Sequence, residues 1–246
     1  MMSLEDLQRS FDYLGRKDPF WAILGDPTKR GNKWQAQEFF ETGEREIKDL
    51  MEHVESLGVR ISKRKALDFG CGAGRLTQAL APYFGEVHGV DIAPSMIELA
   101  NRYNRYGDTC KYHLNNSGSL ELFADDSFDL IYSNITLQHI QPQYSKGYIK
   151  EFVRVLAPSG LLLFQVPSRL VNPNWIKERM KKAMPTLLGI YRRIRFGYGS
   201  LISMHGIDRQ EVITVLERSG ARIIEVSENQ DAGRRWISYR YCATKL

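Results

Sequence analysis

Three glycines at alternating positions follow the first apolar run that could form a buried strand. The run is Lys65–Phe69, and Gly70, Gly72 and Gly74 come directly after it. Glycine lets the backbone turn tightly and approach a ligand with no Cβ in the way. Ligands of open α/β sheets bind at the carboxyl ends of the strands, so this loop predicts a small-molecule site. The alternative interpretation is a tight turn that binds nothing.

Two acids and one arginine narrow the class of ligand. Asp68 lies at the end of the first strand, where a carboxylate suits a cationic group better than a pyrophosphate. Arg75 stands where the dinucleotide-binding pattern requires glycine or alanine. Asp91 follows the next apolar run, 21 residues after Gly70, at about the separation expected of an acid that binds both hydroxyls of a ribose. The alternative for Asp91 is a charge that favours a helix N-terminus.

The pattern of apolar residues around these motifs predicts an α/β fold. A helical segment over residues 1–58 precedes strands that alternate with helices, which favours a parallel sheet with helices on both faces. The last two strands are joined by a turn with no room for a helix, so they should be antiparallel. The predicted strands are Lys65–Phe69, Glu86–Val90, Lys111–Leu114, Phe128–Ser133, Gly160–Val166, Ala221–Ser227 and Trp236–Ala243. The predicted helices are Trp34–Leu57, Leu76–Phe84, Pro94–Tyr106, Ile135–His139, Tyr144–Leu156 and one from Asp208 to Gly220.

Composition excludes several classes of protein. The 246 residues are 43% hydrophobic and 26% charged, which is typical of a globular domain and not of a disordered or fibrous chain. The N-terminus lacks the basic start and apolar core of a signal peptide, and no apolar stretch is long enough to span a membrane. The three cysteines have no metal-ligand spacing. We therefore expect a reduced, cytoplasmic protein without a metal centre.

Four stretches together resemble the core motifs of class I S-adenosylmethionine-dependent methyltransferases. They are LDFGCGAGRLTQAL, EVHGVDIAPSMIELA, DDSFDLIYSNITLQHI and RVLAPSGLLLFQVP, and they span about Lys65 to Pro167 in the family's order. The resemblance implies a doubly wound, seven-stranded sheet of order 3-2-1-4-5-7-6, mostly parallel with an antiparallel last strand. It also implies S-adenosyl-L-methionine as cofactor, and a catalytic domain over residues 59–246 behind an N-terminal helical cap.

The resemblance also implies roles for residues of the glycine loop and the strand ends. Asp68 and the backbone of the loop would hold the methionine part of the cofactor, Asp91 would bind its ribose, and Ile92 and Met96 would contact adenine. This chain lacks the family's usual acid after the third strand, so Asn116 or Ser117 would meet the adenine amino group. Asn134 would pass beneath the sulfonium, Gln138 would face the cofactor or the acceptor, and Phe39–Arg45 would cover the methionine end. The loop residues in this prediction are Gly70, Cys71, Gly72 and Gly74.

Two histidines are candidates for a catalytic base. Imidazole titrates near neutral pH, which suits His139 and His205 to proton transfer. The alternative for each is a structural hydrogen bond. Many methyltransferases need little help from a base, because positioning an activated methyl group in line with its acceptor supplies most of the rate.

A basic segment suggests the class of acceptor. Ser168–Gly197 carries eight basic residues and one acid, and the remaining 26 basic and 28 acidic residues sum to −2. Residues 168–206 are predicted to form a helical lid inserted after the fifth strand, and Arg192, Arg193 and Arg195 would attract an anionic acceptor. The alternatives are a solvated charged face and docking on an anionic membrane surface.

Three functions compete for this sequence. The favoured one is methylation of a small-molecule or glycan acceptor, with an anionic acceptor as one option. A methyltransferase acting on RNA or protein is disfavoured, because Ser133–Thr136 lacks the Asn/Asp-Pro-Pro-aromatic run associated with planar nitrogens and no nucleic-acid module is present. The third is a cofactor-binding protein without catalysis, which the intact glycine loop disfavours.

Overall fold

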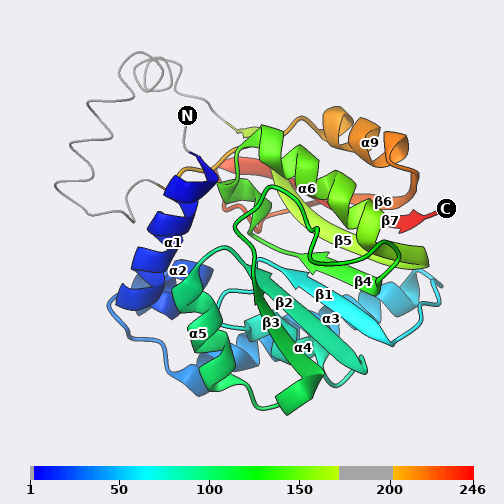
Figure 1. Ribbon diagram of the computed structural model, residues 1–246. Helices are drawn as coiled ribbons and strands as arrows, with labels where there is room; N and C mark the ends of the chain where they lie inside the picture. The colour runs from blue at the N-terminus through cyan, green and yellow to red at the C-terminus, as the bar shows by residue number, and fades with distance from the viewer. Residues whose placement is uncertain (1–2, 172–201) are drawn as a thin grey trace.

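A single seven-stranded sheet organises the chain (Figure 1). The computed structural model describes residues 3–171 and 202–246. The strand order is β3-β2-β1-β4-β5-β7-β6, which confirms the predicted topology. The strands are β1 (Lys65–Phe69), β2 (Glu86–Asp91), β3 (Cys110–Leu114), β4 (Phe128–Ser133), β5 (Leu156–Leu170), β6 (Ala221–Asn229) and β7 (Trp236–Lys245).

Strand direction also follows the prediction. The strands β1 to β5 pair in parallel, whereas β7 runs antiparallel to both of its neighbours, β5 and β6. The carboxyl ends of β1, β2 and β4 therefore meet at one edge of the sheet, where the chain reverses its direction of strand addition between β1 and β4. That edge receives the glycine loop, Asp91 and Asn134.

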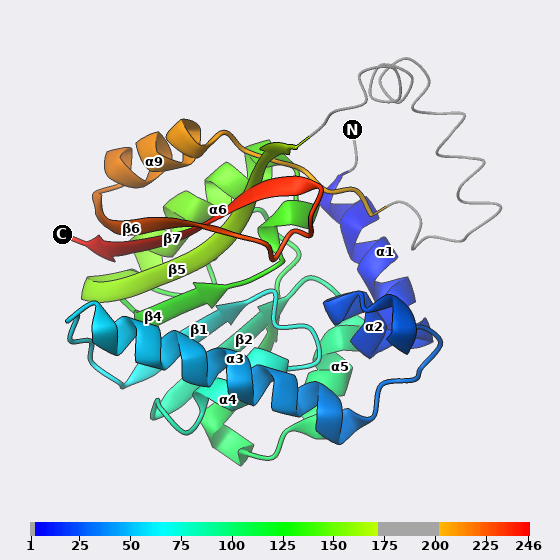
Figure 2. The same cartoon turned by 180° about the vertical axis from the view of Figure 1, so that it is seen from behind.

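Helices cover both faces of the sheet, as Figures 1 and 2 show. Ala66, Leu130 and Tyr132 point from alternate strand positions into a core with the helices of one face, while Leu67 and Ile131 point into the core on the other. The first face is packed by α3 (Ala36–Ser56) and α4 (Arg75–Leu80), and the second by α6 (Pro142–Val155) and α9 (Arg209–Arg218). Because successive side chains of a strand point to opposite faces, this alternation determines on which face of the sheet each side chain lies.

The first helix, α1 (Leu4–Lys17), crosses the loop that follows β2. It begins with a capping box in which Ser3 and Asp6 satisfy each other's backbone N–H groups. Ser95, in the first turn of α5 (Pro94–Tyr103), donates its N–H to Asp12 Oδ1 at 2.8 Å and its hydroxyl to the Asp12 carbonyl at 2.9 Å. Gln8 donates to the Ile92 carbonyl at 3.0 Å. These bonds hold α1, and with it the short α2 (Pro19–Leu24), over the carboxyl ends of the strands.

Several elements differ in length from their predictions. The fifth strand runs from Leu156 to Leu170, and so includes residues 168–170 of the predicted lid. The predicted helix Ile135–His139 is only a 3₁₀ turn, η3 (Leu137–His139), because Ile135 has a left-handed backbone with φ of 50°. Two further 3₁₀ turns are η1 (Pro27–Lys29) and η2 (Gly107–Thr109). Most of the predicted lid, including Arg192, Arg193 and Arg195, lies outside the described residues.

Within residues 3–171 and 202–246, no helix is long and apolar enough to cross a membrane.

A pair of stacked histidines joins β2 to β3. The rings of His88 and His113 lie 5.0 Å apart, with His88 Nδ1 2.8 Å from His113 Nε2. His88 Nε2 lies 2.6 Å from Glu86 Oε1, so this nitrogen carries the proton and Nδ1 accepts from His113. Burial lowers the pKa of both imidazoles.

The neutral histidine pair predicts a loss of stability in mild acid. Below pH about 6.5 the unfolded chain binds protons that the folded pair resists, so the free energy of unfolding should fall as the pH drops from 7 to 5. Each such proton contributes a slope of at most about 1.4 kcal/mol per pH unit. Replacing both residues by glutamine should make the pH dependence measured by urea unfolding less steep. An unchanged slope in the double variant would show that the pair does not resist protonation.

Candidate active site

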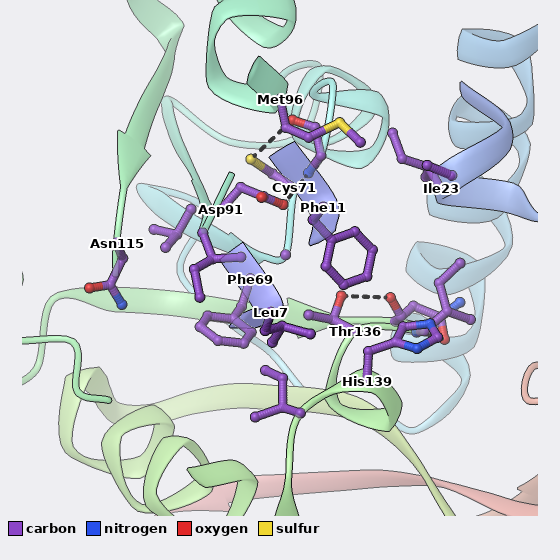
Figure 3. A pocket seen from close by; sticks show the side chains of 18 of the residues that line it. Leu7, Phe11, Ile23, Phe69, Cys71, Asp91, Met96, Asn115, Thr136 and His139 are labelled. Atoms are coloured by element: carbon purple, nitrogen blue, oxygen red, sulfur yellow. Dashed lines mark hydrogen bonds between the residues drawn. The ribbon is translucent and has the colours of Figure 1, made fainter. Parts of the chain in front are cut away.

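A pocket opens at the carboxyl ends of β1, β2 and β4, beneath α1 and α2 (Figure 3). Its empty space, counted out to the solvent at its mouth, is about 900 Å³. Most of its wall is apolar: α1 contributes Leu4, Leu7 and Phe11, and α2 contributes Ala22 and Ile23. The polar lining comes from the strand ends, so the pocket combines an apolar cover with a polar floor.

The glycine loop forms part of that floor. Gly70 and Gly72 line the pocket in left-handed backbone conformations, with φ of 81° and 53°. A Cβ on Gly70 would lie 2.2 Å from Thr136, and one on Gly72 would lie 2.7 Å from Ile23. The loop is fastened to β2, because the N–H groups of Gly70 and Cys71 both donate to the Val90 carbonyl, at 2.8 and 2.9 Å. Only glycine therefore gives the backbone both this turn and this exposure to the pocket.

Asp91 lies at the centre of the polar floor. Its Oδ2 accepts the N–H of Gly72 at 2.9 Å, and its Oδ1 accepts the N–H of Ala93 at 2.8 Å. Burial raises the pKa of this carboxyl, against the opposing effect of the two backbone hydrogen bonds. A carboxylate has about four acceptor positions, so both oxygens keep capacity for ligand donors. Ile92 and Met96, on the following turn and helix, also line the pocket and supply apolar surface beside the acid.

A buried ion pair connects the glycine loop to the end of β4. Arg75, only 3% exposed, donates to Glu46 of α3 at 2.8 Å. The other oxygen of Glu46 accepts from Tyr132 and from Asn134, each at 2.8 Å. Burial alone would raise the pKa of Glu46, but the Arg75 guanidinium and these hydrogen bonds bring it below its ordinary value. Arg75 and Asn134 both line the pocket, so Glu46 sets the position of two site residues at once.

Arg75 keeps one donor unused. Its Nε is buried and has no hydrogen-bond partner among the described residues. A buried guanidinium N–H without a partner costs free energy, and a ligand acceptor such as a carboxylate would satisfy it.

His139 faces the pocket from η3. Its ring packs edge-on against Phe11 of α1 (Figure 3). The centroids of the two rings are 5.6 Å apart. Burial lowers the pKa of His139 to about 4, so the imidazole is neutral at physiological pH. Its Nδ1 is buried without a hydrogen-bond partner in the described part of the chain. A neutral imidazole with a free ring nitrogen can bind or deprotonate a ligand group.

The structure brings together eight of the fourteen predicted site residues. Those that line the pocket are Gly70, Cys71, Gly72, Asp91, Ile92, Met96, Asn134 and His139. The other six, which lie outside the lining, are Asp68, Gly74, Asn116, Ser117, Gln138 and His205.

The residues outside the lining have contacts of their own. Asp68 accepts the Thr77 hydroxyl at 2.7 Å on the α4 side of the sheet, and burial raises its pKa to about 7. Gly74 leaves room for Tyr112, whose hydroxyl would lie 2.5 Å from an added Cβ. The backbone N–H of His205 donates to the carbonyl of Gln138, a residue of η3, at 2.7 Å, which holds His205 against this turn.

Sequence reasoning missed several lining residues. Asn115, rather than Asn116 or Ser117, faces the pocket after β3. The cover comes from α1 and α2, whereas Phe39 and Phe40 of the predicted cap are buried in a separate aromatic cluster with Phe20. The apolar spacing of Leu4, Leu7 and Phe11 was the available signal for the cover, since these residues share one helical face.

Part of the chain is similar to proteins that are already known. Residues 67–164 match the methyltransferase domain family. The chain is 34% identical over 124 residues to malonyl-[acyl-carrier protein] O-methyltransferase of Halorhodospira halophila, covering 49% of this chain and 40% of that protein. It is 32% identical over 208 residues to a sterol 4-C-methyltransferase of Caenorhabditis elegans, covering 80% of this chain and 58% of that protein. The chain spans 40% to 50% of the length of the first curated relatives that it matches.

The fold is shared with solved structures. Magnesium protoporphyrin IX methyltransferase from Synechocystis, with bound S-adenosylhomocysteine, superposes with a TM-score of 0.68 at 15% identity, over 99% of each chain.

The buried ion pair predicts a contrast between two neighbouring acids of α3. Glu46→Gln should lower the free energy of unfolding by about 2–4 kcal/mol, because it leaves the buried Arg75 charge without a counter-ion. The amide oxygen can replace only one of the two carboxylate oxygens, so the amide NH2 group faces a side-chain donor in place of an acceptor. The matched control is Glu44→Gln, whose pair with Arg105 is half exposed, at 54% and 52%, and should cost less than about 1 kcal/mol. Urea unfolding measures both. Equal losses would mean that burial does not strengthen the Arg75 pair.

Proposed function

We propose that the chain transfers a methyl group from S-adenosylmethionine to a small-molecule acceptor, since residues 67–164 match the methyltransferase domain family. The observation that carries the proposal is the single pocket that joins Gly70, Gly72 and Asp91 on one side to Asn134 and His139 on the other. Gly70, Gly72 and Asp91 suit the nucleoside and amino-acid parts of the cofactor. Asn134 and His139 would face the acceptor as it meets the methyl group.

The lining fits the cofactor. Gly70 and Gly72, in left-handed conformations and without a Cβ, expose their backbone to the pocket. Each carboxylate oxygen of Asp91 accepts one backbone N–H and can accept a further hydrogen bond from a ribose hydroxyl. The unpaired Nε of Arg75 suits the carboxylate of the methionine part. Ile92 and Met96 would contact adenine, and we propose Asn115 as the polar contact to its amino group.

The predicted residues behind the lining would act through their neighbours. We propose that Asp68 supports the start of α4 through Thr77, and that Gly74 allows the close packing of the loop against Tyr112. Asn116 and Ser117 would shape the turn that presents Asn115, since Ser117 donates its hydroxyl to the Asn115 side chain at 3.1 Å.

The protein would contribute to the reaction mainly by positioning the acceptor and the methyl group, and less by acid or base catalysis. The bound cofactor supplies a methyl group activated by a sulfonium, so that bond formation to the acceptor breaks the carbon–sulfur bond and leaves a neutral thioether. Asn134, held by Glu46, would fix the end of β4 beneath the reacting atoms. His139, neutral at physiological pH, would accept the proton that the acceptor loses, and His205 would support it from behind η3. The apolar cover of α1 and α2 would exclude water.

The names of several relatives support a class of acceptor. The matched relatives are named for a malonyl-[acyl-carrier protein], a demethylmenaquinone and a sterol, and the similar solved structure for a magnesium protoporphyrin. These names support a small-molecule or carrier-bound acceptor for this chain. The cysteines of the described residues are free and buried, which supports action in the reducing cytoplasm.

Cofactor binding and transfer should both depend on Asp91. Asp91→Ala removes charge-assisted hydrogen bonds to the ribose, each worth roughly 1.5–3 kcal/mol, so the affinity for S-adenosylhomocysteine in calorimetry should fall at least about tenfold. With isotopically labelled S-adenosylmethionine and a metabolite extract, the unaltered chain should give a labelled methylated product that mass spectrometry identifies. The variant should give little or none.

The control for this test is Asp108→Ala, on the exposed turn before β3 at the opposite edge of the sheet. It should bind and transfer like the unaltered chain. Binding without any labelled product would favour a cofactor-binding protein, labelled RNA or protein would favour a macromolecular acceptor, and unchanged affinity in Asp91→Ala would remove the ribose assignment.

We also propose that the basic segment attracts an anionic group of the acceptor. Such attraction is screened over about 10 Å at 0.1 M salt, so the acceptor KM should rise with ionic strength while the cofactor Kd stays constant. Replacing Arg192, Arg193 and Arg195 by glutamine should remove the salt dependence. A KM that is flat from low to high salt would indicate an uncharged acceptor.

A further inference from the structure

The turn that follows β3 carries an amide whose orientation is dictated by backbone groups. Asn115 is 7% exposed and lines the pocket. Its Nδ2 donates to the carbonyl of Ser119 at 2.8 Å, and its Oδ1 accepts the backbone N–H of Ser117 at 3.3 Å. A carbonyl can only accept and a backbone N–H can only donate, so an amide turned by half a rotation would lose both bonds. The positions of the donor and acceptor atoms of Asn115 are therefore fixed.

One face of α6 holds residues 115–120, which form this turn. The Tyr148 hydroxyl donates to the Ser117 carbonyl at 2.5 Å, and the Glu151 carboxylate accepts the N–H of Leu120 at 2.7 Å. Burial raises the pKa of Tyr148 to about 12, so the phenol keeps the proton that it donates. The α6 residues that face the turn follow helical spacing and are Tyr144, Gly147, Tyr148 and Glu151.

Tyr148 connects this turn to the core beneath the pocket. It is 2% exposed, lines the pocket, and packs against Phe69 at the end of β1, with ring centroids 4.6 Å apart. Ser117, whose carbonyl accepts from Tyr148, also donates its hydroxyl to Asn115 Oδ1 at 3.1 Å. The position of the Tyr148 hydroxyl is thus transmitted through Ser117 to the Asn115 amide. Figure 3 shows Asn115 across the pocket from His139, on the side away from the proposed acceptor.

An amide of fixed orientation distinguishes adenine from hypoxanthine. Adenine presents a donor at its 6-amino group and an acceptor at N1, whereas hypoxanthine presents an acceptor at its 6-carbonyl and a donor at N1. The pattern is therefore reversed at both positions. An asparagine that can turn its amide can bond either base, but one held by backbone partners matches only one of them. A base with the wrong pattern leaves buried polar groups unpaired and binds more weakly.

We propose that Tyr148 is a positioning residue that gives the cofactor pocket its selectivity for adenine, because it holds the turn that fixes the Asn115 amide. The inference rests on the S-adenosylmethionine site and the adenine contact proposed above, and it is independent of the acceptor. It assigns to α6, a helix outside the glycine loop and the strand ends, a part in the choice of cofactor.

Calorimetry with S-adenosylhomocysteine and S-inosylhomocysteine measures this selectivity, since the two compounds differ only in the base. The unaltered chain should bind the adenine compound at least about tenfold more tightly. Tyr148→Phe removes one hydroxyl and keeps the ring against Phe69. It should weaken binding of S-adenosylhomocysteine about threefold to tenfold and change binding of S-inosylhomocysteine little, because the second compound lacks the matched contact. The ratio of the two Kd values should therefore fall at least about threefold.

Tyr144→Phe is the matched control. Tyr144 lies one turn earlier on the same face of α6, and a Cβ on Gly118 would lie 3.7 Å from its Cδ1. In the described part of the chain no hydrogen bond joins Tyr144 to residues 115–120, so this variant should bind both compounds as the unaltered chain does. Ser117→Ala changes an exposed residue and removes the hydroxyl bond to Asn115. It should lower the Kd ratio as well, which keeps the proposal testable if Tyr148→Phe does not fold.

The results separate this proposal from the cofactor site on which it depends. If the unaltered chain binds neither compound, the S-adenosylmethionine site is wrong and the role of Tyr148 is refuted with it. If it binds both compounds equally, the cofactor site stands and the Asn115 amide does not select the base. If Tyr148→Phe weakens both compounds by the same factor, or neither of them, Tyr148 contributes packing alone and is not a positioning residue.

Discussion

The ion pair between Arg75 and Glu46 is the interaction on which the arrangement of the site depends. It joins the first residue of α4, the middle of α3 and, through Asn134 and Tyr132, the end of β4. These segments are distant in sequence, and a buried charge tolerates few alternative partners because each unpaired charge is costly. The glycine loop and the strand end opposite it are therefore held at one fixed separation. The pocket between them is a consequence of that separation.

The features that the sequence predicted well are formed by residues close together in the chain. Lys65–Phe69 and the glycines after it combine a strand pattern with a turn that few other residues can make, and Asp91 ends the neighbouring strand at the same edge. The strand order needed more than local pattern, because order is a property of the whole sheet. It came from the resemblance of four motifs in sequence to a family whose sheet order is shared.

What the sequence missed depends on geometry between elements. Asp68 and Phe69 are adjacent, but the alternation of β1 sends Asp68 toward Thr77 behind the sheet and leaves Phe69 in the lining. Asn115, and not Asn116, lines the pocket, and its N–H pairs with the Asp91 carbonyl, which continues the register of β2 and β3 by one residue. The cover by α1 rests on the bonds of Gln8 and Asp12 to Ile92 and Ser95, about 83 residues away in the chain, which no local pattern contains.

The left-handed backbone of Ile135 marks a position at which a substitution could make the protein more stable. A β-branched residue in that region costs on the order of 1–3 kcal/mol, and here the conformation is held by two oxygens, Asn134 Oδ1 and Gln165 Oε1, that accept its N–H at 3.1 Å. Glycine would adopt the same backbone freely. The isoleucine side chain, however, lines the pocket, so its apolar surface comes with a strained backbone. Selection for thermal tolerance and selection for ligand contact would therefore act in opposite directions at this one position.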